Sequence, residues 1–108
     1  MLILRIGPRD YEFDLERVKR IELGRHEIAQ IRLDDDNVSV HHAELLSEEN
    51  LLVLRDLGST NGTLLNGDHV RQSVVQDGDR IDIGNTTIHV HRQGRIDSGA
   101  TVDTESPE

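Results

Sequence analysis

The sequence contains no cysteine and no tryptophan, and its aromatic side chains are one tyrosine and one phenylalanine. Without cysteine the chain forms no disulfide and offers no thiolate, which fits a reducing compartment. No hydrophobic run approaches the roughly 20 residues that a membrane-spanning helix needs. The N-terminal segment, Met1 to Ile6, is short and carries Arg5 too early for a signal peptide. These features predict a cytoplasmic protein that does not enter a membrane.

Aliphatic side chains have to build the core, since aromatic residues make up only 2% of the chain. Leucine, isoleucine and valine number 13, 9 and 9. The β-branched residues among them favour strands, so the composition indicates a β-rich protein. A length of 108 residues fits one domain.

The net charge is −9, from 12 basic and 21 acidic residues. Proteins that bind nucleic acid need a basic surface, so the charge argues against DNA and RNA and equally against anionic membranes. An acidic protein can still bind a phosphate where its few cations gather. Such a cluster is expected from the sequence positions of Arg17, Lys19, Arg20 and Arg25.

Short apolar or alternating segments, separated by glycine, asparagine and aspartate, run through the first 92 residues. This pattern is typical of strands joined by tight turns, and it predicts a two-sheet antiparallel β-sandwich of about ten or eleven strands. Residues 26–30 fit either one helical turn or a loop. The expected strands are 2–6, 11–15, 18–23, 31–33, 42–46, 51–54, 63–65, 69–71, 74–75, 80–83 and 86–91.

Residues 56–67 stand out as a polar turn between two aliphatic runs. Asn61-Gly62 and Asn66-Gly67 suit backbone with positive φ, which asparagine and glycine tolerate. A tip locked by its own turn chemistry holds hydroxyl and amide groups at fixed positions. An anion site needs such a tip, because the donors are then ordered before the ligand binds.

Asp56-Leu57-Gly58-Ser59-Thr60-Asn61-Gly62-Thr63, followed by Asn66-Gly67, resembles the signature of forkhead-associated (FHA) domains. Leu23-Gly24-Arg25 is similar to the glycine-arginine motif of that family, and Ser39-Val40-His41-His42-Ala43 to its serine-x-x-histidine motif. Asp77 to Gly84 matches its late turn and strand. The resemblance covers residues 2 to 92 and implies an FHA-like β-sandwich that binds phosphothreonine peptides.

The resemblance implies a phosphopeptide site made of Arg25, Ser39, Thr60 and Asn61. A guanidinium makes paired, charge-assisted hydrogen bonds to phosphate, and the two hydroxyls add donors. Asn61 offers a donor and an acceptor to the ligand main chain. Possible further ligand contacts are Asn37, Val40 and His41, and expected structural supports are Gly24, His42, Gly58 and Gly62. Many FHA domains have arginine at the position of Val40.

The resulting prediction is a non-catalytic signalling adaptor or regulatory domain, without cofactor or metal, that recognises substrates of a serine/threonine kinase. The methyl group of phosphothreonine contributes roughly 0.8 kcal/mol when buried. The alternative is a degenerate FHA domain that mediates phosphate-independent interaction or oligomerisation, because Val40 removes a cation.

Other chemistries remain as weaker hypotheses. His89 and His91 share one strand face and could bind a metal. Ser39, His42 and Asp56 hold the residue types of a hydrolase triad, although no nucleophile-elbow motif accompanies them. The acids at 34–36 lack the spacing of a calcium loop and are expected to be solvated.

Residues 93–108 have few apolar side chains and a net negative charge, so we expect a disordered acidic tail after a domain spanning 1–92. Thr101 and Thr104 lie in this tail. If a kinase modifies either of them, the tail could bind the phosphopeptide site of its own chain, or that of a neighbour in a head-to-tail arrangement.

Overall fold

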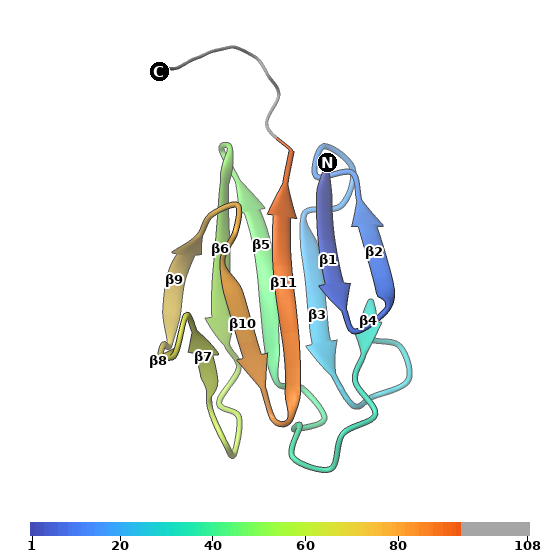
Figure 1. Cartoon of the computed structure of the whole chain (residues 1–108), viewed down its shortest axis with the longest axis vertical. Coiled ribbons are helices and arrows are strands. Elements are labelled where there is room, and N and C mark those ends of the chain that lie inside the picture. The colour runs from blue at the N-terminus through green and yellow to red at the C-terminus, as the bar shows by residue number, and fades with distance from the viewer. Residues whose placement is uncertain (94–108) are drawn as a thin grey trace.

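The computed structural model describes residues 1–93 of the chain as eleven strands in two facing sheets (Figure 1). The six-stranded sheet has the order β2-β1-β11-β10-β7-β8, and the five-stranded sheet has the order β4-β3-β5-β6-β9. The strands are β1 (Leu2–Ile6), β2 (Arg9–Phe13), β3 (Arg20–Gly24), β4 (Ile31–Arg32), β5 (Ala43–Glu48), β6 (Leu51–Asp56), β7 (Thr63–Leu65), β8 (Asp68–His69), β9 (Gln72–Val75), β10 (Arg80–Ile83) and β11 (Thr86–Arg92).

The predicted all-β sandwich is confirmed, with one departure from a purely antiparallel arrangement. Strand β4 runs parallel to β3, pairing Leu23 with Ile31 and Gly24 with Arg32. Residues 25–30 loop out and lead the chain back in the same direction beside β3. This stretch, ambiguous in the sequence, contains turns and bends and no helical residue.

Several predicted strand boundaries are wrong where a local turn interrupts an apolar alternation. The backbone oxygen of Asp14 accepts hydrogen bonds from Arg17 N and Val18 N, so Leu15 lies in a turn, Val18 follows that turn, and neither continues a strand. Arg71 likewise lies between two strands, since β8 ends at His69 and β9 begins at Gln72.

The core between the sheets is aliphatic, as the composition predicts. Leu4 pairs with Val90 and Ile81 with Ile88 in one sheet, and Leu45 pairs with Leu54 in the other. All six side chains are buried. Because alternate residues of each strand point inward, these pairs form the two faces that pack together. Tyr11 and Phe13 are only partly buried against this cluster.

The strand directions place the polar loops at one end of the sandwich. Strands β3, β6 and β10 all end at the lower end in Figure 1, and the chain enters β5 and β11 from there. The connections 25–42, 57–62 and 84–85 therefore gather at this end, whereas the chain termini of the described part lie at the other.

The predicted tail falls almost entirely outside the described residues. Strand β11 ends at Arg92, and Gln93 N donates a hydrogen bond to the backbone oxygen of Met1. Thr101 and Thr104 lie beyond Gln93, so the tail and its proposed self-binding stay predictions. Residues 1–93 include no helix, and hence none that is long and apolar enough to cross a membrane.

A charged ladder covers the outer face of the five-stranded sheet around Glu44, which is only 2% exposed. Glu44 accepts hydrogen bonds from Arg20 Nε and, at 2.8 Å, from Arg55 Nε. Burial by itself raises the pKa of Glu44, but the hydrogen bonds and charges of the two arginines outweigh it. The pKa of this carboxyl therefore lies below its ordinary value.

We expect Glu44→Gln to lower the free energy of unfolding by about 1–3 kcal/mol at pH 7, because three charge-assisted hydrogen bonds, one from Arg20 and two from Arg55, lose their acceptor charge. A carboxyl with a depressed folded-state pKa stabilises the fold above its unfolded pKa, which is about 4.3. This stabilisation disappears as the pH falls through the lower folded value. Urea unfolding between pH 7 and pH 3 should show a steeper loss for the wild-type chain than for the variant.

The matched control is Glu12→Gln on the exposed edge strand β2, which should follow the wild-type profile. Equal acid sensitivity of the wild-type chain and the Glu44 variant would show that the ladder does not contribute to stability.

Candidate functional site

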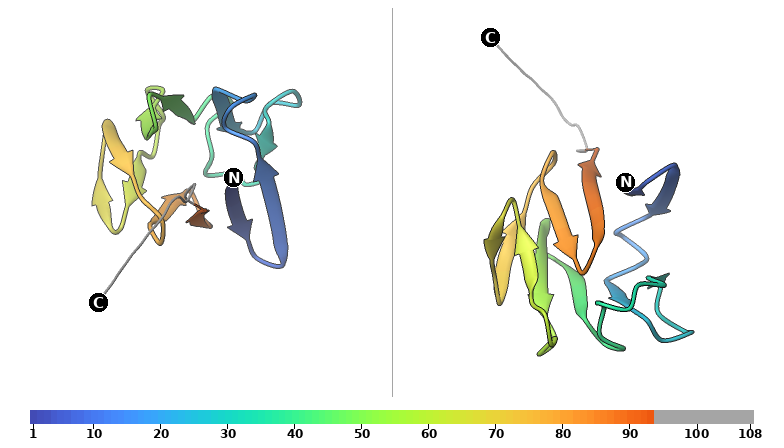
Figure 2. Two further views of the ribbon diagram at one scale, coloured as in Figure 1. Left: turned by 90° about the horizontal axis from the view of Figure 1, so that it is seen from above. Right: turned by 60° about the horizontal axis from the view of Figure 1, so that its bottom comes forward.

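Two loops meet at the lower end through backbone hydrogen bonds that extend the sheet beyond β3. Arg25 N donates to the backbone oxygen of Ser39 at 3.2 Å, and His26 N donates to that of Val40 at 3.4 Å. With this end turned toward the viewer, Figure 2 (right) shows the loops that follow β3, precede β5 and follow β6 gathered there. The positions of Arg25 and Ser39 are therefore fixed by main-chain pairing.

Gly24 is required where these two segments approach each other. A Cβ atom built at Gly24 would lie 2.2 Å from the backbone oxygen of Val40, closer than atoms can pack. A side chain at this position is therefore excluded by the backbone of Val40.

His42 joins the Ser39 segment to the loop after β6. Its side chain is fully buried. Ser39 N donates to His42 Nδ1 at 3.0 Å, so this nitrogen carries no hydrogen. The other nitrogen, Nε2, therefore carries the hydrogen and donates it to the backbone oxygen of Gly62 at 2.8 Å. One neutral imidazole thus braces both loops.

The carboxylate of Asp56 organises the 57–62 loop from within. One oxygen accepts from Gly58 N and Ser59 N, and the other from the hydroxyls of Ser59 and Thr63, all at 2.6–2.8 Å. Burial raises the pKa of Asp56, but these four hydrogen bonds outweigh it and leave the pKa below its ordinary value. The loop is therefore closed by a carboxylate that stays ionised at neutral pH.

Gly62 completes this loop with a φ of +87°, in the left-handed region that favours glycine. A Cβ there would also lie 2.8 Å from the His69 ring. Ser59 Oγ accepts a hydrogen bond from Gly62 N at 2.9 Å, which closes the turn.

The four residues assigned to the phosphopeptide site all connect to residues 37–39. Thr60 N donates to Ser39 Oγ at 3.0 Å, and Asn61 Nδ2 donates to the backbone oxygen of Asn37 at 2.9 Å. Arg25 Nε donates to the backbone oxygen of Val38 at 2.6 Å. The structure brings these four residues and Asn37 together from three loops. Arg25, Thr60 and Asn61 are exposed, and Ser39 is half-buried.

Several polar groups at this end remain available to a ligand. Within residues 1–93, the two terminal nitrogens of Arg25, the hydroxyl hydrogen of Ser39 and the Thr60 hydroxyl make no hydrogen bond. Asn61 uses its amide nitrogen and leaves its oxygen as an acceptor. The arrangement offers one cation and two hydroxyls, held in place by other atoms of the same residues.

The two remaining candidate contacts differ in their surroundings. Val40 is 44% exposed and supplies no charge. His41 is exposed too, but its Nδ1 lies 2.5 Å from a Glu22 carboxylate oxygen, so its ring is paired with β3. His41 therefore does not replace the missing arginine as a free cation.

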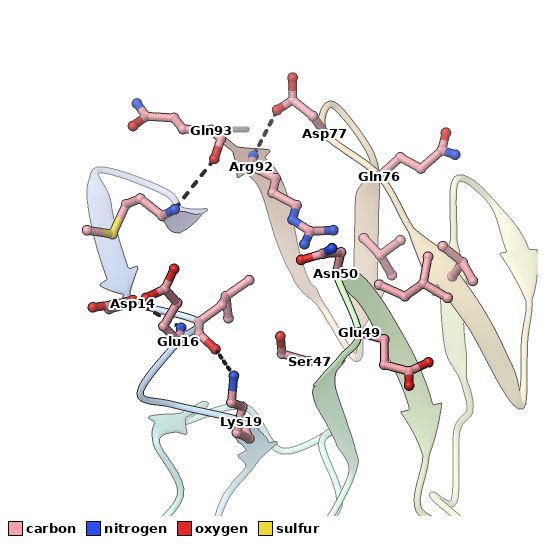
Figure 3. A pocket seen from close by; sticks show the side chains of 15 residues that line it. Asp14, Glu16, Lys19, Ser47, Glu49, Asn50, Gln76, Asp77, Arg92 and Gln93 are labelled. Carbon is pink, nitrogen blue, oxygen red and sulfur yellow. Dashed lines mark hydrogen bonds between the residues drawn. The ribbon is translucent and has the colours of Figure 1, made fainter. Parts of the chain in front are cut away.

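The prediction that Arg17, Lys19 and Arg20 gather with Arg25 is wrong. Lys19 donates to the backbone oxygen of Leu15, and Arg20 is held by Glu44. Lys19 also lines a cavity of about 770 Å³ at the opposite end of the sandwich, together with Asp14, Asn50 and Arg92 (Figure 3). Neighbours in sequence are separated here by β3, since that strand carries the chain from one end to the other. The cation that joins Arg25 is Arg32, whose Nε donates to the backbone oxygen of Arg25 at 3.1 Å.

Sequence reasoning missed the role of Asp35, which it assigned to a solvated loop. The Asp35 carboxylate accepts hydrogen bonds from Asn37 N, Asn85 N and the Thr86 hydroxyl at 2.8–2.9 Å. The bond from Asn37 is the main cause of a pKa below the ordinary value, and those from Thr86 and Asn85 add to it. An aspartate two residues before Asn37 is a local turn signal. Its partners fifty residues away carry no such signal.

The alternative chemistries find no support in this geometry. His42 Nδ1 accepts from the backbone of Ser39, and Ser39 Oγ accepts from Thr60 N, so no imidazole activates the hydroxyl. In the described part of the chain, neither the acidic loop nor the pair His89 and His91 belongs to a group of three converging metal ligands.

The fold and the loop-borne polar rim define a β-sandwich recognition domain. A model of the FHA domain family matches residues 21–84. The chain belongs to the FHA domain family, a family of phosphothreonine-recognition modules.

Individual relatives agree with this assignment. The glycogen accumulation regulator GarA of Mycobacterium tuberculosis is 37% identical over 84 residues, which cover 78% of this chain and 52% of GarA. The chain thus spans about half the length of this relative.

Solved structures are similar as well. The FhaA FHA domain, complexed with an intracellular domain, has 34% identity and a TM-score of 0.76, covering 84% of this chain and all of that one. An FHA domain studied for phosphothreonine-dependent interactions has 33% identity and a TM-score of 0.78, covering 86% of this chain and 97% of that one.

We expect Gly24→Ala to lower the free energy of unfolding by about 1–3 kcal/mol, because the added methyl group forces the 24–26 segment away from the backbone of Val40. Urea denaturation measures the loss, and amide hydrogen exchange of Arg25 and His26 reports the weakened pairing. Ala29→Gly in the neighbouring loop is the control for local substitution. Unchanged exchange at both amides in Gly24→Ala would contradict the steric role of Gly24.

Proposed function

We propose that Arg25, Ser39, Thr60 and Asn61 form the phosphothreonine-peptide site of this FHA domain. The observation that carries the proposal is the meeting of three separate loops: the side chains of Arg25 and Asn61 and the backbone N of Thr60 each donate a hydrogen bond to residues 37–39. Arg25 supplies a charge-assisted contact to the phosphate, and Ser39 and Thr60 supply hydroxyl donors. Asn61 accepts a hydrogen bond from the ligand main chain through its free oxygen.

Preorganisation supports this assignment in a chain whose net charge is −9. The loops that carry the donors are braced by His42 and Asp56 before any ligand arrives, so little loop entropy is lost on binding. Arg25 and Arg32 place two guanidinium groups on the same short segment. Local charge is therefore favourable to a phosphate although the protein as a whole is acidic.

Ligand selectivity beyond the phosphate is proposed to arise beside Asn37 and Asn61. A shallow cavity of about 190 Å³ lies there, lined also by Leu64 and by the turn at Gly84-Asn85. An extended peptide held by Asn61 can place a neighbouring side chain in this cavity. Which side chain fits best is a question for a degenerate phosphothreonine peptide library.

We assign the domain to a regulatory or adaptor role in the cytoplasm, with substrates of a serine/threonine kinase as partners. The similar FhaA domain bound to an intracellular domain supports this location. We also propose that the FHA domain ends at Arg92. If a kinase modifies Thr101 or Thr104, we propose that the tail binds the phosphopeptide site of its own chain or of a neighbour.

A second candidate function is phosphate-independent interaction, which the neutral Val40 favours. Calorimetric titration of a phosphothreonine peptide and of its unphosphorylated twin distinguishes the two. Our proposal requires binding of the phosphorylated peptide only. Equal affinity for both peptides would favour the degenerate domain.

We expect Arg25→Ala to weaken phosphopeptide binding by about 1.5–3 kcal/mol and Ser39→Ala by about 0.5–1.5 kcal/mol, because a charge-assisted hydrogen bond exceeds a neutral one. Calorimetry measures both. Arg17→Ala, which removes the same charge at the opposite end, is the matched control and should bind as the wild-type chain does. Equal losses of affinity in Arg25→Ala and Arg17→Ala would show that Arg25 contributes only through the net charge of the protein and does not contact the phosphate.

A further inference from the structure

Glu22, His26 and His41 converge beside the loops of the phosphopeptide site. Glu22 lies in β3, His26 in the loop that follows, and His41 just before β5. His41 Nδ1 and His26 Nε2 lie 2.5 Å and 3.0 Å from the same carboxylate oxygen of Glu22. One nitrogen from each histidine and one oxygen of Glu22 all lie within 4.8 Å of one another, and in residues 1–93 no other three potential metal ligands converge in this way.

The nitrogen of His26 in this cluster is buried and has no hydrogen-bond partner in the described part of the chain. This nitrogen lies 3.0 Å from the Glu22 oxygen, which is short enough for a hydrogen bond, but the angle between the two groups does not allow one. A buried polar atom without a partner is rare and destabilising, and it marks a position where a further group completes the structure. Here the neighbouring atoms are a carboxylate oxygen and a second imidazole nitrogen.

The orientation of the Glu22 carboxylate is fixed from its other side. Arg20 Nη1 lies 3.4 Å from the carboxylate oxygen that does not face the histidines. Outer contacts of this kind fix the ligands of metal sites.

The spacing fits a small transition-metal ion. Zinc binds imidazole nitrogen at about 2.0–2.1 Å and carboxylate oxygen at about 2.0–2.2 Å, so ligand atoms in a tetrahedral site lie roughly 3.4 Å apart. The two separations of 2.5 Å and 3.0 Å need to widen by less than about 1 Å. The His41 side chain is 63% exposed, and its rotation can provide this change.

We propose that Glu22, His26 and His41 form a binding site for a divalent transition metal, with Zn²⁺ as the best match. Two imidazoles and one carboxylate are a zinc ligand set that leaves a fourth position for water or another donor. The metal would satisfy the buried nitrogen of His26. It would also clamp together the two segments that carry Arg25 and Ser39. This site is separate from the exposed pair His89 and His91.

The test is calorimetric titration of ZnCl₂ into the full 108-residue chain without an affinity tag. We expect one Zn²⁺ per chain, at least about tenfold weaker binding in His26→Ala and in His41→Ala, and an unchanged affinity in the control His89→Ala. CaCl₂ should give no binding at this site, since imidazole ligands favour transition metals. Co²⁺ should give the visible absorption bands of a tetrahedral complex.

His41→Ala keeps the proposal testable if His26→Ala fails to fold, because His41 is exposed. Circular dichroism establishes folding of each variant before titration. Absence of Zn²⁺ binding by the wild-type chain would overturn the proposal. So would binding that survives in the folded His41→Ala variant, and so would an equal loss in His89→Ala.

Discussion

The neutral imidazole of His42 links the loops on which the proposed phosphopeptide site depends. The ring is fully buried. It accepts a hydrogen bond from Ser39 N and donates one to the backbone oxygen of Gly62. A buried polar ring with both nitrogens satisfied stabilises one arrangement of its neighbours, because any other arrangement leaves a polar atom unpaired. The aliphatic sandwich beneath it provides the rigid base from which the loops project.

The site itself is built from hydrogen bonds between loops. Thr60 and Asn61 each use one polar atom to hold the neighbouring loop and keep another for a ligand, while the Ser39 hydroxyl oxygen accepts from Thr60 N and its hydrogen stays available. This division of atoms explains how exposed, short side chains can form a preorganised anion site. Asp56 and Asp35 contribute by bonding backbone N–H groups, so that negative charge stabilises the loops that surround a site for a negative ligand.

Charged side chains on the outer face of the five-stranded sheet continue into the proposed metal site. Glu44 is neutralised by Arg20 and Arg55, and Arg20 also contacts Glu22. Glu22 in turn faces His26 and His41. The proposed metal site and the proposed phosphopeptide site therefore share the segments after β3 and before β5. A metal ion bound by Glu22, His26 and His41 would restrict the segments that carry Arg25 and Ser39.

The sequence by itself determined the features that depend on residues close together in the chain. Alternation of aliphatic residues and the Asn-Gly turns are local, and they were enough to predict the sandwich, its strand number and the polar tip at 56–67. The motifs around Arg25, Ser39 and Asn61 identified the family. Pairings between distant residues carry no local signal: the parallel β4, the anchoring of Asp35 by Asn85, and the meeting of Glu22 with His41. Only the tertiary structure decided these, because they depend on which loops the strand order brings to one end.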